Sequence, residues 1–421
     1  MSKTSTVLIV GQNYAPETSG NAPYTSSLAS GLAALGHKVR VVTAQPYYPN
    51  WVVADGYDHW ATSSVEGDVR VDRKRHFVPA RPTGLTRLLS ELSFGLRSLM
   101  APWGKRDVVV FVSPSLFAVA TAILRGKITR QPVVIWVQDL YSLGISETGQ
   151  GNAVVASVMR VVESTVLRLA DGIVTIHDRF QRNVIEQLRC NADRVWVVRN
   201  WTHLAEAEPV DRQTVRARMG WNDDDVVVLH AGNMGVKQGL ENVVEAARLA
   251  ESAKSSVKFV LLGGGNQRES LLSLGRDVSH LEFVDPLPDE AFQEVLGAAD
   301  VLLVNEKPGV SGMSVPSKLT SYMGTGLPIL ASTDEGSVTE EEITISKAGI
   351  TVRAGDPGAL LTAAEELGAD PYRRTAMGLA GLQFRQRHFD EKHAIERYAH
   401  VLEEVVAGRR RPPMKNQGTT E

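Results

Sequence analysis

The chain has 421 residues, of which 43% are hydrophobic and 22% charged, and its formal net charge at pH 7 is −3. This length predicts two domains rather than one core, and the small net charge gives no general attraction to nucleic acid. The single cysteine, Cys190, excludes an intramolecular disulfide framework and a metal site built from several cysteines.

The first forty residues predict a βαβ unit rather than a signal peptide. TVLIVG at 6–11 is an apolar run ending in glycine, which is typical of a buried parallel strand. The helix expected next turns one face inwards, formed by Tyr24, Leu28, Leu32 and Leu35. The strand VRVVT at 39–43 completes the unit. Because no run of about 18 apolar residues is present either, we expect a cytoplasmic protein without a transmembrane helix.

Apolar strand patterns alternate with helical stretches along the rest of the chain. Further strands of a first series are expected at 107–113, 132–137, 172–176 and 194–198. The segment 199–213 breaks the alternation and is predicted to be a linker. A second series is expected at 226–232, 258–264, 280–284, 300–304, 327–332 and 349–354.

This alternation predicts the α/β class, with two doubly wound, Rossmann-like domains that face each other across a cleft. The expected boundaries are 1–203 for the N-terminal domain, 204–385 for the C-terminal domain, 386–408 for a final helix that packs back on the first domain, and 409–421 for a disordered tail. Ligands of such sheets bind beyond the carboxyl ends of the strands. The loops that follow the strands are therefore the candidate site.

Two glycine-bearing loops follow strands of the second domain and lead into helices. They are HAGNMGVKQG at 230–239, which contains Lys237, and LLGGGNQRESL at 261–271. Glycine lets the backbone approach a ligand closely, and a helix N-terminus favours anions. Together the loops predict a diphosphate site, although a glycine turn beside a solvated lysine explains either loop alone.

A third segment, MSVPSKLTSYMGTGLPIL at 313–330, places Pro316, Ser317 and Lys318 at the start of a predicted helix. A capping serine beside a solvated lysine is the alternative interpretation. Three cationic or N–H-rich loops favour a nucleoside diphosphate. The loop GQNYAPETSG at 11–20 has no G-x-G-x-x-G fingerprint, which argues against a dinucleotide.

The segment 70–106 is basic, with nine arginine and lysine residues against Asp72 and Glu91. Apolar residues recur in it at helical spacing: Leu85, Leu88, Leu89, Leu92, Leu96, Leu99 and Trp103. One interpretation is a helix packed on the first sheet with a solvated basic rim. The other is an amphipathic patch at 81–106 that lies on an anionic membrane surface.

On its motifs the chain resembles retaining glycosyltransferases of family 4, which have the GT-B fold. The resemblance rests on NYAPETSG, VIWVQDLY, AGNMGVKQG, LLGGGNQRESL and VPSKLTSYMGTGLPIL, which occur in the family's order. It is strongest with the branch for colanic acid, O-antigen and exopolysaccharide biosynthesis, which includes fucosamine-transferase-like proteins. It implies metal-independent, cofactor-free transfer of a sugar, most simply from a UDP-sugar, to a saccharide or polyprenyl-diphosphate-linked acceptor at the inner face of the cell membrane.

The resemblance also implies the site residues. Those of the nucleotide-sugar site are Gly20, Asn233, Lys237, Gly263, Gly265, Phe283, Leu287, Pro316, Ser317, Lys318 and Ser321. The candidate catalytic residues are Lys237, on the leaving diphosphate, and Asp139, which positions the acceptor. A glutamate pair common in the family is missing, because Met313 and Ser321 stand at its positions. Two alternatives remain open: a nucleotide-sugar epimerase on the same fold, and a non-catalytic subunit that binds a sugar nucleotide.

Overall fold

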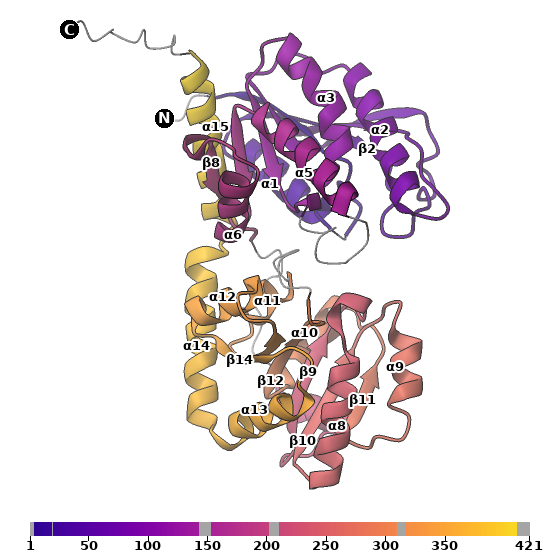
Figure 1. Cartoon of the computed structure of the whole chain (residues 1–421), viewed down its shortest axis with the longest axis vertical. Helices are drawn as coiled ribbons and strands as arrows, with labels where there is room; N and C mark the ends of the chain where they lie inside the picture. Colours follow the sequence, from indigo (N-terminus) through magenta and orange to yellow (C-terminus); the bar gives the residue numbers. More distant parts are fainter. Residues whose placement is uncertain (1–3, 19, 143–152, 202–209, 310–316, 411–421) are drawn as a thin grey trace, which may run out of the picture. The chain divides into compact units, whose positions relative to one another are not determined.

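The structure is a computed structural model, and it describes residues 4–18, 20–142, 153–201, 210–309 and 317–410. These residues form two compact units, and each is described by itself (Figure 1). Unit 1 contains the described residues up to 142, together with 153–201 and 391–410, and unit 2 contains 210–309 and 317–390. Within the described ranges, no helix is long and apolar enough to cross a membrane.

Unit 1 is built on an eight-stranded sheet with the order β3-β4-β2-β1-β5-β6-β7-β8. Its strands are β1 (Thr6–Val10), β2 (Lys38–Ala44), β3 (Ala61–Glu66), β4 (Val69–Lys74), β5 (Val108–Val112), β6 (Val133–Val137), β7 (Gly172–Thr175) and β8 (Val195–Val197). The six strands predicted for this half are confirmed. The antiparallel pair β3–β4 was not predicted, because β3 is an exposed edge strand with a polar sequence.

The helices of unit 1 include α1 (Ala22–Ala34), α2 (Gly84–Met100), α3 (Leu116–Ile128), α5 (Ala153–Arg168) and α6 (Asp178–Arg182). Short helical turns lie at η1 (Asn183–Gln187) and η2 (Ala192–Arg194). The prediction for α1 was wrong at one position, because Leu35 caps the helix and is exposed, whereas Tyr24, Leu28 and Leu32 are buried. The predicted apolar helix also ends early: α2 stops at Met100, and Trp103 is buried beyond it.

The chain returns to unit 1 with its last helix, α15 (Glu391–Arg410), which contacts α1. Ser27 Oγ donates a hydrogen bond of 2.6 Å to Glu391, and Trp196 Nε1 donates one of 3.1 Å to Glu404. The ring of Tyr398 lies 5.3 Å from that of Trp136, centroid to centroid. Most of the predicted tail, from 411 onwards, lies outside the described residues.

Unit 2 is built on a six-stranded, fully parallel sheet with the order β11-β10-β9-β12-β13-β14. Its strands, all six of them predicted, are β9 (Val226–Ala231), β10 (Val257–Leu262), β11 (Leu281–Val284), β12 (Val301–Asn305), β13 (Ile329–Thr333) and β14 (Gly349–Arg353). Successive residues of β9 belong to two different hydrophobic clusters, Val228 to one and Leu229 to the other. Both faces of the sheet are therefore covered, as parallel sheets require.

The two faces of this sheet carry helices and one short helical turn, η3 (Val236–Gln238). The helices are α7 (Arg212–Met219), α8 (Glu241–Ala253), α9 (Arg268–Leu274), α10 (Asp289–Ala298), α11 (Ser317–Tyr322), α12 (Val338–Ser346), α13 (Pro357–Ala369) and α14 (Pro371–His388). The carboxyl ends of the strands are the edge from which the candidate loops emerge.

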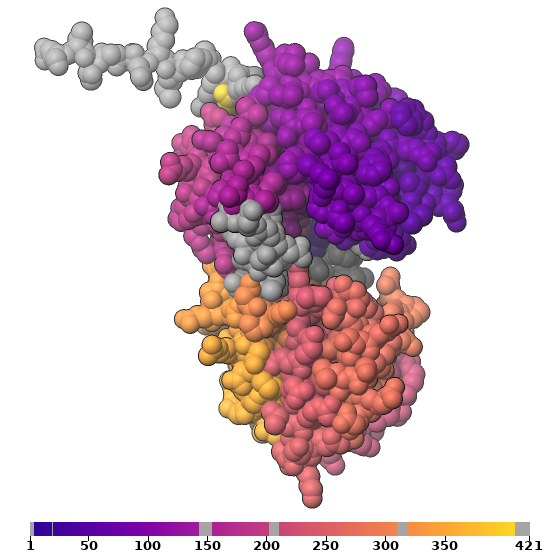
Figure 2. Space-filling view, turned by 45° about the vertical axis from the view of Figure 1, so that its right-hand side comes forward, coloured from indigo at the N-terminus to yellow at the C-terminus, as the bar shows by residue number. Residues whose placement is uncertain are grey.

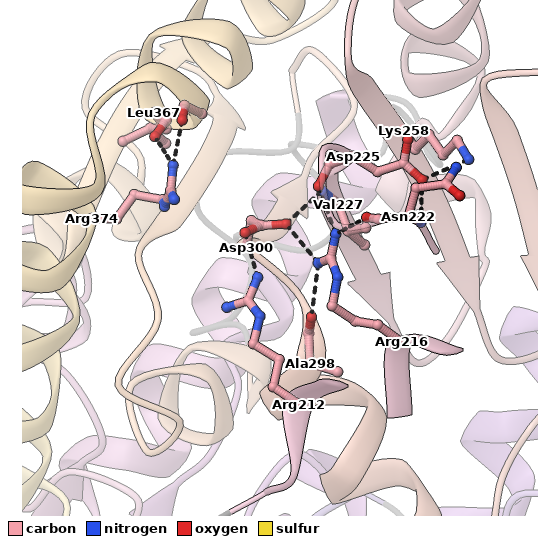
Figure 3. Close-up of polar contacts among 11 residues, drawn as sticks. Arg212, Arg216, Asn222, Asp225, Val227, Lys258, Ala298, Asp300, Leu367 and Arg374 are labelled. Carbon is pink, nitrogen blue, oxygen red and sulfur yellow. Dashed lines mark hydrogen bonds and ion pairs between the residues drawn. The ribbon is translucent and has the colours of Figure 1, made fainter. Parts of the chain in front are cut away.

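A buried ionic network ties α7 to the starts of β9 and β12 (Figure 3). Asp300 accepts from Arg216 Nη1 at 3.0 Å and from the backbone N–H of Val227 at 2.9 Å, and it also pairs with Arg212. Arg216 donates to the carbonyls of Asn222 and Asp225 at 2.6 and 2.7 Å. Because each charge is paired and hydrogen-bonded, the network can be buried.

The predicted linker is ordered at both described ends. Trp201 stacks on Trp136 in unit 1, with ring centroids 5.9 Å apart. In unit 2, Asp211 caps α7 by accepting from the N–H of Thr214 at 3.3 Å. The segment between them, 202–209, lies outside the described residues.

Candidate functional site

The two predicted glycine turns of unit 2 interlock. They follow β9 and β10, which pair in parallel with Ala231 opposite Leu262. Gly232, Gly263 and Gly265 have φ angles of 116°, 128° and 145°, which side-chain-bearing residues rarely adopt. A Cβ on Gly263 would lie 2.3 Å from the carbonyl oxygen of Gly232. The sequence therefore needs glycine here so that the two turns can touch.

Asn233 lies between these turns and is exposed. A Cβ on Gly265 would lie 2.7 Å from its Oδ1, and a Cβ on Gly235 would lie 2.9 Å from its Nδ2. The N–H of Gly235 donates a hydrogen bond of 3.0 Å to Gln238. The structure thus brings together three of the predicted residues, Asn233, Gly263 and Gly265, and leaves the Asn233 amide open to solvent.

Lys318 reaches the same turns from α11. Its Nζ lies 2.7 Å from Nε2 of His230, and a Cβ on Gly232 would lie 3.2 Å from its Cε. Burial lowers the pKa of the Lys318 amine to about 7. Burial, followed by the charge of Lys318, lowers the pKa of His230 well below its ordinary value. An ammonium group can only donate, so a neutral His230 accepts the hydrogen bond.

Tyr322 explains why α11 holds Lys318 at this place. Its hydroxyl accepts from the N–H of Ala231 at 2.8 Å, which fixes the helix to the end of β9. Ser321, on the same helix, is half-buried. Pro316, the side chain of Ser317 and Met313 lie outside the described residues. The predicted convergence of Ser317 with Lys318 is therefore not described.

Lys237 lies on η3 and is exposed. It forms no ion pair within the described part of the chain. Its backbone carbonyl accepts a hydrogen bond of 2.9 Å from the N–H of Lys307, which follows β12 and is also exposed. Two lysines thus lie on adjoining backbone segments at the carboxyl edge of the sheet, although only Lys237 was predicted.

The assignment of Phe283 and Leu287 to the donor site stays a prediction, and the structure describes only their packing in unit 2. Phe283 is half-buried and packs against the hydrophobic cluster on one face of the sheet, and Leu287 packs against the cluster on the other face. Each side chain is therefore partly buried at the edge of a hydrophobic cluster. Pro286, between them in the chain, lies 3.6 Å from the Cβ position of Gly264.

Glu306 is a carboxylate at the end of β12 that the sequence did not assign to the site. One of its oxygens accepts a hydrogen bond of 2.7 Å from Thr339, and the other accepts from Thr333. Glu306 therefore connects the end of β12 to β13 and α12 through hydrogen bonds. In the sequence it precedes Met313, the first position of the missing glutamate pair.

Gly20 and Asp139 lie in unit 1, at the carboxyl edge of its sheet. Gly20 has a φ of 64° and lies beside Tyr48, whose Cε1 is 3.5 Å from the Cβ position. Asp139 follows β6, is half-buried, and accepts a hydrogen bond of 2.8 Å from the N–H of Leu140. Its backbone carbonyl accepts one of 3.3 Å from Ser113.

A buried polar cluster at this edge escaped the sequence analysis. Gln12 Nε2 lies 3.1 Å from His76 Nε2, and Gln12 Oε1 accepts from Ser115 Oγ at 2.6 Å. Beside them Glu91 is hydrogen-bonded to the hydroxyl of Tyr141. Burial raises the pKa of Glu91 to about 7 and lowers that of His76 to about 4. These residues come from five separate segments, so no local pattern reveals them.

The geometry defines a class of protein: two α/β units with largely parallel sheets, one of which carries two touching glycine turns with a lysine beside them. Residues 19–201 match the model of the glycosyl transferase 4-like domain, and residues 225–370 match that of glycosyl transferases group 1. The colanic acid biosynthesis glycosyl transferase WcaI of Escherichia coli is 34% identical over 333 residues, which are 76% of this chain and 81% of that protein.

Solved structures are similar in fold. Sucrose-phosphate synthase from Thermosynechococcus elongatus superposes with a TM-score of 0.76 at 17% identity, over 96% of this chain and all of that one. HepE from Anabaena, solved with UDP-glucose, gives a TM-score of 0.66 at 16% identity, over 95% and 100% of the two chains. The chain belongs to glycosyltransferase family 4, a family of retaining, nucleotide-sugar-dependent transferases with the GT-B fold. Membership of this family classes the chain as a retaining transferase.

Proposed function

We propose that this enzyme transfers a sugar from a UDP-sugar, with retention, to a polyprenyl-diphosphate-linked saccharide during surface polysaccharide biosynthesis. The observation that carries the donor part is the contact of Lys318 with Gly232 on the interlocked glycine turns. Backbone that no side chain covers, next to a positively charged group, is an environment that favours a diphosphate. Support for UDP comes from HepE, which was solved with UDP-glucose, and support for the pathway from the name of WcaI.

Two lysines supply the positive charge in this proposal. Of the two site residues on the loop after β9, Asn233 is neutral and Lys237 is charged. Lys318, on helix α11, provides the second charge. As the bond from the sugar to the diphosphate breaks, negative charge grows on the leaving phosphate, and these preorganised donors stabilise it. Ser321 is assigned to the ribose, and Gly263 and Gly265 to the close approach of the backbone.

Asp139 is assigned to the acceptor. It lies at the carboxyl edge of the sheet of unit 1, two residues before Tyr141 of the buried polar cluster. A half-buried carboxylate that keeps an exposed side can accept a hydrogen bond from an acceptor hydroxyl and orient it. Gly20, on the same edge, leaves backbone open for the donor phosphates.

The donor assignment is tested by titrating the protein with UDP, GDP and ADP in a calorimeter and in thermal melts, since a ligand that binds only the folded state raises the melting temperature. We expect UDP to bind most tightly. A stronger response to GDP or ADP would overturn the choice of base. Incubation with the matching nucleotide sugar and a polyprenyl-diphosphate-linked saccharide, followed by NMR of the new glycosidic bond, then tests transfer and retention.

A further inference from the structure

Apart from Phe94, the residues that helix α2 buries fully are small or polar, and part of its apolar side is exposed. The residues it buries are Ser90, Glu91, Phe94, Gly95 and Ser98, whereas Leu85, Leu89, Leu96 and Met100 are exposed, Leu85 and Met100 by 68% and 67%. A surface helix normally buries its apolar stripe. The exposed leucines are therefore not explained by the folding of unit 1.

Close packing against α3 accounts for this orientation. A Cβ on Gly95 would lie 1.8 Å from Oγ1 of Thr121 and 2.9 Å from Cα of Ala118. Only a small-residue face of α2 fits so near to α3, so the leucine face must turn outwards. The close approach of the α2 backbone at Gly95 to α3 thus determines the orientation of the helix.

The apolar surface continues over the neighbouring helices. α2 contacts α3, and α3 contacts α5, so the three form one layer on the sheet (Figure 1). α3 exposes Leu124 and Ile128, and α5 exposes Val154, Val155, Val158 and Val161. We call these exposed residues of the three helices the α2–α3–α5 surface. The stretch of sequence that contains these helices is coloured violet to magenta in Figure 2.

The charges on these helices have one sign at the surface. Their carboxylates are Glu91 and Glu163, and both are buried. Arg87, Arg160 and Arg168 are exposed. At the edge of α2 the guanidinium of Arg97 lies 4.0 Å from the ring centroid of Trp60, which is 67% exposed. Leucines flanked by arginine and tryptophan are the composition that favours the interface between lipid headgroups and acyl chains.

We propose that the α2–α3–α5 surface binds a bilayer that contains anionic phospholipids, with the leucines of α2 turned towards the acyl chains. This proposal deepens the proposed function and rests on it, because a lipid-linked acceptor gives the enzyme a reason to bind a membrane. The surface shares no residue with the donor site, so the two can be tested separately. A second copy of the chain fits less well, because two such surfaces would bring arginines together. An anionic membrane complements both the charge and the apolar residues.

The test measures binding of the full chain, without nucleotide, to phosphatidylcholine vesicles with and without phosphatidylglycerol. We expect sedimentation with the anionic vesicles that weakens as salt rises. The variant Leu89→Gln/Leu96→Gln should bind at least about 10-fold more weakly, because two large apolar contacts are lost. Its matched control is Leu249→Gln/Leu379→Gln, which alters leucines of similar exposure, 43% and 53% against 48% and 52%, on α8 and α14.

Charge is tested in the same way. Arg81→Glu/Arg87→Glu should lose about 10-fold or more in affinity for the anionic vesicles, and the control Arg276→Glu/Arg397→Glu should bind normally. Arg97 is left intact, because it also donates to the carbonyls of Arg75 and Trp60. The proposal would be overturned if the leucine and arginine variants bound as well as their controls. Equal binding of the parent protein to vesicles with and without phosphatidylglycerol would also overturn it.

UDP titration of the same variants without lipid separates this proposal from the donor assignment. Normal UDP binding with lost vesicle binding supports the surface, and lost UDP binding in the parent protein overturns only the donor site. Sedimentation of the free protein tests self-association. A dimer that Leu89→Gln/Leu96→Gln converts to a monomer, with vesicle binding unchanged, would assign the surface to a second copy and overturn the lipid proposal.

Discussion

Lys318 Nζ lies within hydrogen-bond distance, 2.7 Å, of Nε2 of His230, and this pair joins α11 to the end of β9. Two cations at this distance would repel, so the imidazole is neutral and serves as an acceptor that orients the ammonium group. Burial lowers the pKa of Lys318 to about 7. The charge of Lys318 is therefore poorly stabilised in the empty site, and a bound diphosphate would stabilise it.

This relationship predicts that UDP binding depends on pH. The unfolded chain holds the Lys318 proton up to the ordinary pKa of 10.5, whereas the folded chain releases it near 7. Between these values the folded state binds fewer protons, so the contribution of this group to stability rises with pH. If UDP binds at Lys318 as proposed, it restores the proton, so its affinity should fall as pH rises above about 7, with proton uptake on binding. Calorimetry in buffers of different ionisation enthalpy measures that uptake.

The control for this linkage is Lys318→Arg, which keeps the positive charge at every pH in the window. Its UDP affinity should vary much less above neutral pH. An equally steep pH dependence in this variant would assign the titration to another group.

The relative weight of two residues on α11 is also testable. Lys318→Ala should weaken UDP binding by about 1–3 kcal/mol, the range for a hydrogen bond to a charged group. Ser321→Ala removes a neutral hydroxyl and should cost only about 1 kcal/mol. Calorimetry at one pH compares them, and a larger effect for Ser321 would mean that the diphosphate does not lie at Lys318.

The sequence predicts the strands of both sheets because most are apolar runs buried on two faces, such as VVVFV in β5. It misses β3, whose sequence ATSSVE is exposed at an edge and has no apolar signal. The helical spacing at 85–103 predicts α2, but neither its end at Met100 nor its orientation. That orientation depends on contact between Gly95 and Ala118, which no local pattern contains.

The candidate site likewise contains some residues that the sequence predicts and others that it does not. Glycine loops and Lys318 can be found in the sequence, since each has its own motif. His230 could have been noticed as the one histidine in the strand VVVLHA, but its pairing with Lys318 joins residues 88 positions apart. Phe283 and Leu287 were assigned by position in a motif, and only the structure shows that each packs, partly buried, against a different hydrophobic cluster.

A prediction for catalysis concerns Lys237. Lys237→Ala should lower kcat by about 10²-fold or more, the loss typical of one transition-state donor. The melting temperature without ligand should stay the same, because this exposed lysine has no ion pair with a described residue. Lys307→Ala, which changes the exposed neighbouring lysine, is the control. Comparable losses in both variants would point to a diffuse positive field rather than to Lys237.

The contact between the two glycine turns can be tested with two substitutions in the loop after β10. Gly263→Ala must force a Cβ to within 2.3 Å of the Gly232 carbonyl at a φ of 128°, so the two turns must separate. We expect a loss of stability of the order of 1–3 kcal/mol and weaker UDP binding. Gly264→Ala is the matched control, since its Cβ would meet only Pro286 at 3.6 Å. Tolerance of Ala at position 263 would show that the turns are not in contact.

The last prediction concerns the buried network around Asp300 (Figure 3). Asp300→Ala leaves the nearly buried Arg216 without its carboxylate and the N–H of Val227 without its acceptor. Removal of one partner of a buried pair costs about 3–5 kcal/mol, so the denaturation midpoint of unit 2 should fall clearly. The contrast is Glu294→Ala, which breaks the exposed pair with Arg218 and should cost at most about 1 kcal/mol. Urea denaturation followed by fluorescence measures both. Similar losses in the two variants would mean that solvent reaches Asp300 and that the network does not fix α7 to the sheet.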